Sequence, residues 1–173
     1  QRGFYYDLAD NEFTIVAQDN LIHGLNNLGD VVGMQAQSGE GLYWSSSQDE
    51  EPALLLPLEG HTGASAVDIN DDGIVIGVTM GEADTAAVVW WVDEDGRPTT
   101  PLELPRPEGY AVGLARHLSE EMNGVTIIVG IARSIDELPD KAVLWSVTVD
   151  NGGPFVSSGP IDLGSVSGTD SSA

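Results

Sequence analysis

The stretch that decides the fold is SAVDINDDGIVIGVTMGEADTAAVVWWVDEDGRPTTPLEL, residues 65–104. Four segments in it are rich in β-branched and aromatic residues: 65–70, 74–78, 87–91 and 101–104. Clusters of Asp, Gly and Pro separate them, and these residues favour tight turns, whereas β-branched and aromatic residues favour strands. The stretch therefore predicts a four-stranded antiparallel meander, which needs neighbouring sheets to bury both of its faces.

The same pattern recurs on both sides of this stretch. Upstream, LNNLGDVVG at 25–33 matches INDDGIVIG at 69–77 with a constant offset of 44 residues. Downstream lies a longer third copy, in which Asn123-Gly124 is the expected first turn. The expected remaining strands are 41–44 and 53–58 in the first copy, and 110–114, 125–130, 141–145 and 160–163 in the third. A four-stranded period of roughly 45 residues is typical of a β-propeller blade.

We therefore expect an all-β protein, a four-bladed β-propeller with one blade incomplete in the chain. The residues Gly3, Phe4, Tyr5 and Tyr6 match a third strand rather than a first one, and Phe13 to Val16 would be the fourth. The expected division of the single domain is a half-blade at 1–19, blades at 20–60, 61–105 and 106–164, and a linker or the start of another blade at 165–173.

An incomplete blade predicts self-association, because it leaves unpaired strand edges and exposed core. Another copy of the chain would supply the missing strand, a head-to-tail contact that builds rings or filaments. Two alternatives remain open: the termini meet within one chain, or the chain is a fragment of a longer repeat protein. The residues expected at the self-association contact are Gly3, Phe4, Tyr5, Tyr6, Phe13, Ile15, Ser171, Ser172 and Ala173.

The sequence resembles the HAF-type repeats of secreted bacterial proteins. The resemblance rests on AVDINDDGIVIG at 66–77, AVVW at 87–90, the segment 25–33 and the Asp162-Leu163-Gly164 tail; residues 114–130 depart from the pattern by insertion. The length and the split blade are also similar to those of tandem-linked four-bladed propeller fibres of environmental bacteria. The HAF-type likeness implies an exported propeller-like module of largely unassigned function, the second likeness implies a fibre subunit, and neither implies a reaction.

Composition narrows the class of partner. The chain has 28 Asp and Glu but only six Lys and Arg, a net charge of -22, which argues against nucleic acid and anionic membranes as partners. No apolar run is long enough to span a membrane, and no cysteine is present. The chain begins at Gln1 without a signal peptide, which fits a processed, exported product or a fragment. The acidic surface either keeps the protein soluble or binds divalent cations.

One turn carries a candidate metal site. Asp68, Asn70 and Asp72 have the spacing of the first half of a calcium loop, but the twelfth position is Thr79 instead of Glu. A β-hairpin turn explains the same residues, since the matching turn at 26–29 keeps the glycine and loses the acids. Calcium is thus the only cofactor that the sequence suggests.

Aromatic residues recur on the expected third strands, among them Trp44, Trp90 and Trp145. They are explained either by packing between blades or by stacking against sugars. The three histidines share no metal-ligand spacing, and no nucleophile or phosphate-loop motif occurs. We therefore expect a non-enzymatic extracellular fibre subunit. The alternative is a secreted propeller module that recognises glycans or calcium.

Overall fold

The computed structural model describes residues 2–7, 12–18, 20–45, 51–134, 138–150 and 153–165, with side chains from Asn20 onward. Within these residues the protein is all-β, as the sequence predicts, with fourteen strands and no helix. The described part of the chain accordingly has no helix that is long and apolar enough to cross a membrane.

The strands form a hairpin and three consecutive meanders. The N-terminal hairpin pairs β1 (Arg2–Asp7) with β2 (Glu12–Gln18). The first meander contains β3 (Asn20–Leu25), β4 (Val31–Gln35), β5 (Gly41–Trp44) and β6 (Ala53–Leu55). The second contains β7 (Gly63–Ile69), β8 (Ile74–Met80), β9 (Thr85–Trp91) and β10 (Leu102–Glu103). The third contains β11 (Val112–Leu118), β12 (Thr126–Arg133), β13 (Lys141–Asp150) and β14 (Gly153–Ser165).

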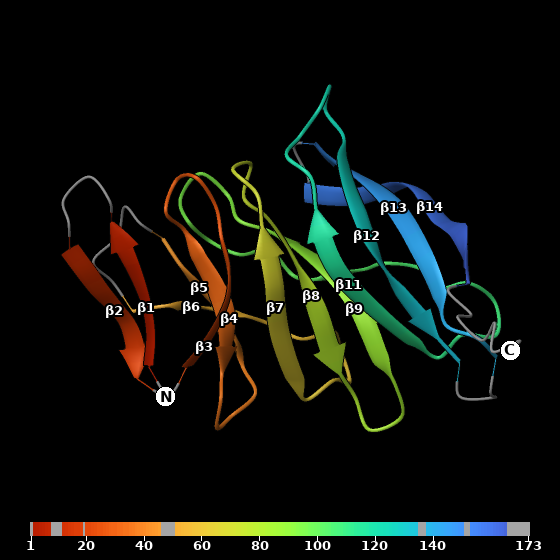
Figure 1. The fold of residues 1–173 in the computed structure, drawn as a ribbon, viewed down its shortest axis with the longest axis horizontal. Coiled ribbons are helices and arrows are strands. Elements are labelled where there is room, and N and C mark those ends of the chain that lie inside the picture. Colours follow the sequence, from red (N-terminus) through yellow and green to blue (C-terminus); the bar gives the residue numbers. More distant parts are fainter. Residues whose placement is uncertain are drawn as a thin grey trace, which may run out of the picture.

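The meanders follow one another along the long axis of the molecule (Figure 1). The hairpin lies at one end of this row and β14 at the other. The first strands β3, β7 and β11 are neighbours, and β1 lies next to β3. A single parallel bridge, between Val112 and Thr85, joins the second and third meanders into one sheet. All pairing inside each meander is antiparallel.

The predicted strands of the first two meanders are present, although the one predicted at 53–58 ends at Leu55, and the third meander needs a larger correction. The turn predicted at Asn123-Gly124 is confirmed, because both residues have positive φ, 56° and 79°. The strand predicted to begin at Pro160 begins instead at Gly153, and its partner β13 extends to Asp150. The two strands form one long hairpin, because backbone pairing with β13 compensates for the weak strand propensity of the Gly, Pro and Ser residues in β14.

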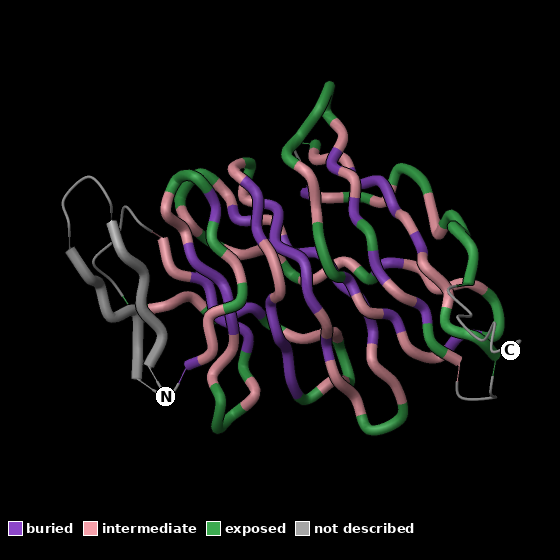
Figure 2. The backbone as a smooth tube through the Cα atoms, in the orientation of Figure 1, coloured by how far each residue is buried: buried purple, intermediate pink, exposed green. Residues whose placement is uncertain are grey.

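The core consists of two clusters on opposite faces of the second meander. Along β8, Val75 packs toward the first meander, whereas Ile74 and Ile76 pack toward the third. Along β9, Val88 and Val89 divide in the same way. The second meander is therefore covered on both faces, and Figure 2 shows burial concentrated in the middle of the row and exposure over β14.

Candidate functional site

Three glycines identify equivalent positions in the three meanders. Gly33, Gly77 and Gly130 stand on the second strands β4, β8 and β12. At each of them a Cβ atom would collide with a backbone carbonyl oxygen of the preceding strand, that of Leu21, Ser65 or Leu114. Only glycine permits this close approach, which explains why the repeat keeps it. The residues around these glycines can therefore be matched from one meander to the next.

The first two meanders each present an equivalent apolar triplet toward the meander that follows. On the first meander the triplet is Val32, Tyr43 and Leu55, with exposed fractions of 0%, 5% and 2%. The equivalent triplet of the second meander, Ile76, Val89 and Leu104, has an exposed fraction of 0% throughout. Both triplets belong to the core clusters between neighbouring meanders. The triplet is thus the contact surface between one sheet and the next.

The third meander has the same triplet and nothing against it among the described residues. Its members are Val129, Leu144 and Leu163, and Val129 and Leu163 are 36% and 55% exposed. Val129 pairs with Leu144 and Leu144 with Ile161, so an apolar row crosses three strands. We call this surface the end face; its residues are Val129, Leu144, Phe155, Ile161 and Leu163.

The opposite end of the row is covered. Val31 and Leu42 point away from the second meander, yet they are only 1% and 4% exposed. The hairpin lies on this side, where β1 approaches β3. The predicted self-association residues Gly3, Phe4, Tyr5 and Tyr6 are in β1, while Phe13 and Ile15 are in β2. Their side chains, and all of Ser171, Ser172 and Ala173, lie outside what the structure describes.

Comparisons of the chain with protein-family models, with curated proteins and with solved structures find no match.

An ion pair joins β13 and β14 at the edge of the third meander. The Lys141 ammonium lies 2.6 Å from an Asp162 carboxylate oxygen and 5.3 Å from the centre of the Tyr110 ring. The hydrogen bond between the two side chains raises the pKa of Lys141 and lowers the pKa of Asp162. Both groups are solvent-exposed at the edge of the core beneath the end face, so the pair orders the edge without adding much stability.

The three predicted calcium ligands have separate hydrogen-bond partners. Asp68 accepts from the amides of Ile69 and Leu118, at 3.1 and 3.4 Å. The side-chain oxygen of Asn70 accepts from the amide of Ile74 at 2.9 Å, and Asp72 accepts from that of Glu121 at 3.1 Å. Among the described residues no group of three or more His, Asp or Glu side chains is arranged to hold a metal ion. Calcium binding at this turn remains a prediction.

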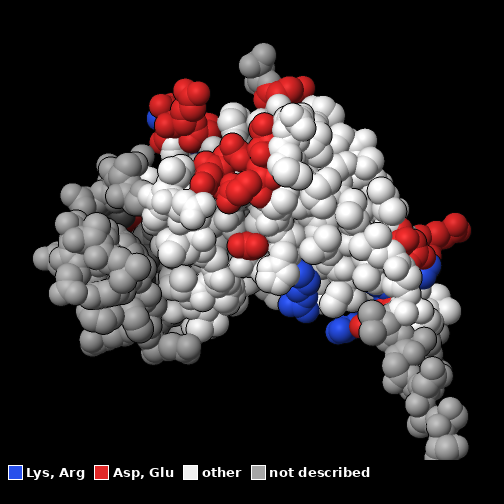
Figure 3. Space-filling model, turned by 45° about the horizontal axis from the view of Figure 1, so that its top comes forward, with Lys and Arg blue, Asp and Glu red and all other residues white. Residues whose placement is uncertain are grey.

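Acidic side chains gather where the turns of the meanders meet. Figure 3 shows this as a dense patch of carboxylates on the upper side of the molecule. A groove of about 710 Å³ runs there, and its walls include Asp30, Asp71, Asp93, Glu94 and Glu121. Carboxylates in the patch also link the turns, because the amide of Asn27 donates to Asp71 and the amide of Asp71 donates to Glu120, at 2.7 and 3.0 Å. These two acids therefore stabilise the contact between meanders.

The recurring tryptophans pack between meanders. Trp90 and Trp145 are 0% exposed, and their indole nitrogens donate to the carbonyls of Leu56 and Pro105 at 2.8 and 2.7 Å. Each bond reaches the last strand region of the preceding meander. For these two residues the packing interpretation is confirmed and stacking against a sugar is wrong. Trp44, the equivalent residue of the first meander, is only partly buried.

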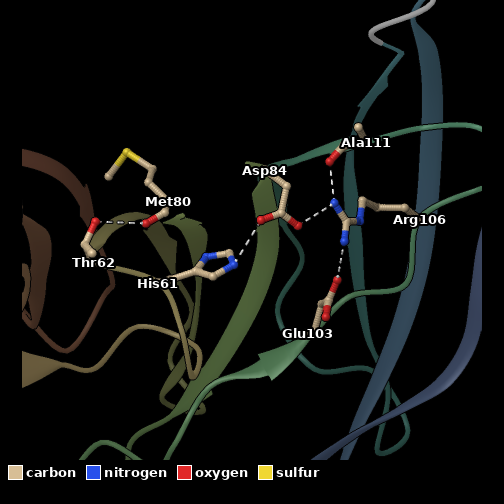
Figure 4. Close-up of polar contacts among 7 residues, drawn as sticks. All are labelled: His61, Thr62, Met80, Asp84, Glu103, Arg106 and Ala111. Carbon is tan, nitrogen blue, oxygen red and sulfur yellow. Dashed lines mark hydrogen bonds and ion pairs between the residues drawn. The ribbon is translucent and has the colours of Figure 1, made fainter. Parts of the chain in front are cut away.

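A polar cluster fixes the chain where it crosses between meanders (Figure 4). One oxygen of Asp84 lies 3.2 Å from His61, which precedes the second meander, and the other lies 3.0 Å from Arg106, which follows it. Arg106 also bonds to Glu103 at 3.0 Å and to the carbonyl of Ala111. Asp84 thus ties the two connections of the second meander together.

The sequence predicts self-association at residues near the chain ends and does not single out the end face. The signal was present in the repeat alignment, since Val129, Leu144 and Leu163 match Ile76, Val89 and Leu104. It was missed because apolar residues at repeated positions indicate core, and whether a neighbour covers them is not visible in the sequence.

Proposed function

We propose that this protein is a non-enzymatic subunit of an extracellular assembly, and that its copies associate head to tail. In this proposal the hairpin and the three meanders are the half-blade and the three blades of a four-bladed β-propeller. Another copy completes the missing part of the fourth blade by strand addition. The resemblance to HAF-type repeats supports the extracellular location.

The observation that carries the proposal is the exposure of the end face. Its residues have the chemistry and the spacing of two triplets that are buried between sheets elsewhere in the same chain, yet Leu163 is 55% exposed where Leu104 is 0% exposed. Each apolar side chain of this size contributes about 1.5–3 kcal/mol when it is buried. A sheet packed on the end face would therefore be stabilised by several such contributions.

The arrangement of the chain explains why the cover would come from a second molecule. The N-terminal hairpin of a second copy is the natural partner for the end face, because a two-stranded sheet alone is only marginally stable. In Figure 1 the chain's own hairpin lies at the opposite end of the row from β14 and does not reach the end face. The two contacting surfaces are different, so the contact is heterologous and repeats from copy to copy.

Negative-stain electron microscopy and sedimentation of the 18.2 kDa chain test the proposal. The wild-type chain should form filaments or closed rings at high concentration. Leu163→Asp places a charge on the end face and should leave single particles. Leu56→Asp is the matched control, since Leu56 is 54% exposed but lies on the first meander, and it should assemble like the wild type. A wild-type chain that stays monomeric, or equal assembly of Leu163→Asp and wild type, would refute the proposal.

A further inference from the structure

The first strands of the three meanders carry β-bulges at equivalent positions. The pairing shifts between Ile22 and Gly24 in β3, between Ala66 and Asp68 in β7, and between Ala115 and His117 in β11. The extra residues are His23, Val67 and Arg116. A bulge turns side chains out of the normal alternation of a strand, and bulges are frequent beside binding sites.

The three bulges line one cavity. Its volume is about 550 Å³, and its wall includes His23, Val67 and Arg116 together with their neighbours Asp68 and His117. The strands come close there, since a Cβ on Gly24 would lie 2.9 Å from the Cα of Asp68. The cavity is thus built by the part of the fold where three repeats converge.

The charges in this cavity differ from those of the rest of the protein. Arg97, Arg106, Arg133 and Lys141 each have a carboxylate oxygen within 3.0 Å. Among the described Lys and Arg side chains, Arg116 alone forms no ion pair, although the chain has 28 acidic residues. Two of the three histidines stand beside it. Arg116 is exposed to solvent at the wall of the cavity, so its guanidinium is available to an anion.

The one carboxylate in the cavity is already engaged. Asp68 accepts from the amides of Ile69 and Leu118, and its Oδ2 lies 3.7 Å from Nδ1 of His117. His23 is oriented by its Nδ1, which lies 2.7 Å from the carbonyl oxygen of Ala66. A carbonyl only accepts hydrogen bonds, so Nδ1 donates to it and this bond fixes the orientation of the ring.

We propose that this cavity binds a small oxyanion, the carboxylate or sulfate group of a ligand, through Arg116 flanked by His23 and His117. The guanidinium presents parallel N–H donors whose spacing matches two oxygens of a carboxylate or sulfate. The site is independent of head-to-tail assembly, because none of its residues belongs to the end face.

Equilibrium dialysis with radiolabelled sulfate and, separately, radiolabelled glucuronate tests the site at constant ionic strength in sodium chloride. The method works for single subunits and for filaments alike. Wild-type protein should bind one of the anions, or both, saturably with one site per chain, and the preference distinguishes sulfate from carboxylate. Arg116→Gln should weaken binding about tenfold or more, as expected for loss of hydrogen bonds to a charged group.

Arg97→Gln is the matched control, because it removes the same charge from the exposed connection between β9 and β10. Both variants therefore have the same net charge and the same general repulsion of anions. It should bind like the wild type. Arg116→Lys, which keeps the charge without the paired donors, should bind more weakly than the wild type but more tightly than Arg116→Gln. Equal retention by wild type, Arg116→Gln and Arg97→Gln, or no saturable retention of either anion, would overturn the proposal.

Discussion

The side-chain Nδ2 of Asn26 donates a hydrogen bond to the backbone oxygen of Asn70, its own equivalent in the next repeat, at 3.1 Å. Asn70 in turn donates to the backbone oxygen of Ser119 at 3.1 Å. The side chains of Asn26, Asn70 and Ser119 also each accept a hydrogen bond from a backbone amide of their own turn. The donors are the amides of Asp30, Ile74 and Ile127, respectively. One side chain per repeat therefore closes its own turn, and the two asparagines also reach the following repeat.

This ladder of hydrogen bonds between repeats predicts that Asn70→Ala lowers the free energy of unfolding by about 2–4 kcal/mol. The substitution removes three side-chain hydrogen bonds, to Ser119, Thr126 and Ile74, and leaves the buried Ile74 amide without its side-chain partner. Asn70 is 2% exposed, so water cannot easily replace the bonds. Asn70→Ser should recover part of the loss, since Ser119 closes its turn with a hydroxyl. Urea denaturation measures these differences. The control Asn27→Ala changes an exposed neighbour and should cost less than about 1 kcal/mol; an equal loss in both variants would contradict the ladder.

Trp90 and Trp44 occupy equivalent positions in neighbouring meanders, but only Trp90 is fully buried, so their substitution should lower stability by different amounts. Trp90→Phe removes a buried indole bond to Leu56 and part of a core side chain, so it should cost about 2–3 kcal/mol. Trp44→Phe should cost less than about 1 kcal/mol, because Trp44 is partly exposed and has no indole hydrogen bond within the described residues. The measurement is the midpoint of thermal unfolding. Equal shifts for the two variants would show that burial between meanders is not what distinguishes them.

Most strands follow from the sequence, because alternation and turn residues act locally. Asn123-Gly124 is one such case, since its positive φ values are those that Asn and Gly tolerate best. The extension of β14 to Gly153 was not predictable in this way, because it depends on pairing with β13. The bulge at Arg116 escaped for a related reason: one inserted residue leaves no clear mark on a short apolar pattern. The exposure of Leu163 depends on which sheet is present beside it, and only coordinates show that.

The cluster around Asp84 predicts that Arg106→Gln destabilises the protein by about 1.5–3 kcal/mol, the usual range for hydrogen bonds to charged groups. The Arg106 side chain is 21% exposed and bonds to two carboxylates and a carbonyl across a connection between meanders. Arg97→Gln is the control, because Arg97 and Asp95 form a solvent-exposed pair, 75% and 69% exposed, that should contribute less than about 1 kcal/mol. Urea denaturation distinguishes the two. A similar small loss in both would mean that Arg106 does not hold the connection.

Tyr43 predicts how stability depends on pH at the alkaline end. Burial raises the pKa of Tyr43 above its ordinary value of 10.0; the hydrogen bond from Ser45 opposes this, and Asp30 adds to it. The unfolded chain therefore loses this proton at a lower pH than the folded chain. The contribution of Tyr43 is complete below pH 10.0 and is lost as the pH rises through the folded-state pKa.

Tyr43→Phe removes this titration, so its free energy of unfolding should fall less steeply than that of the wild type as the pH rises above 10.0. Urea denaturation of both proteins at pH 7 and at several alkaline pH values measures the two slopes. All other titrating groups are shared, so the difference between the curves belongs to Tyr43. Parallel curves across this range would contradict the raised pKa, whatever the difference in stability at pH 7.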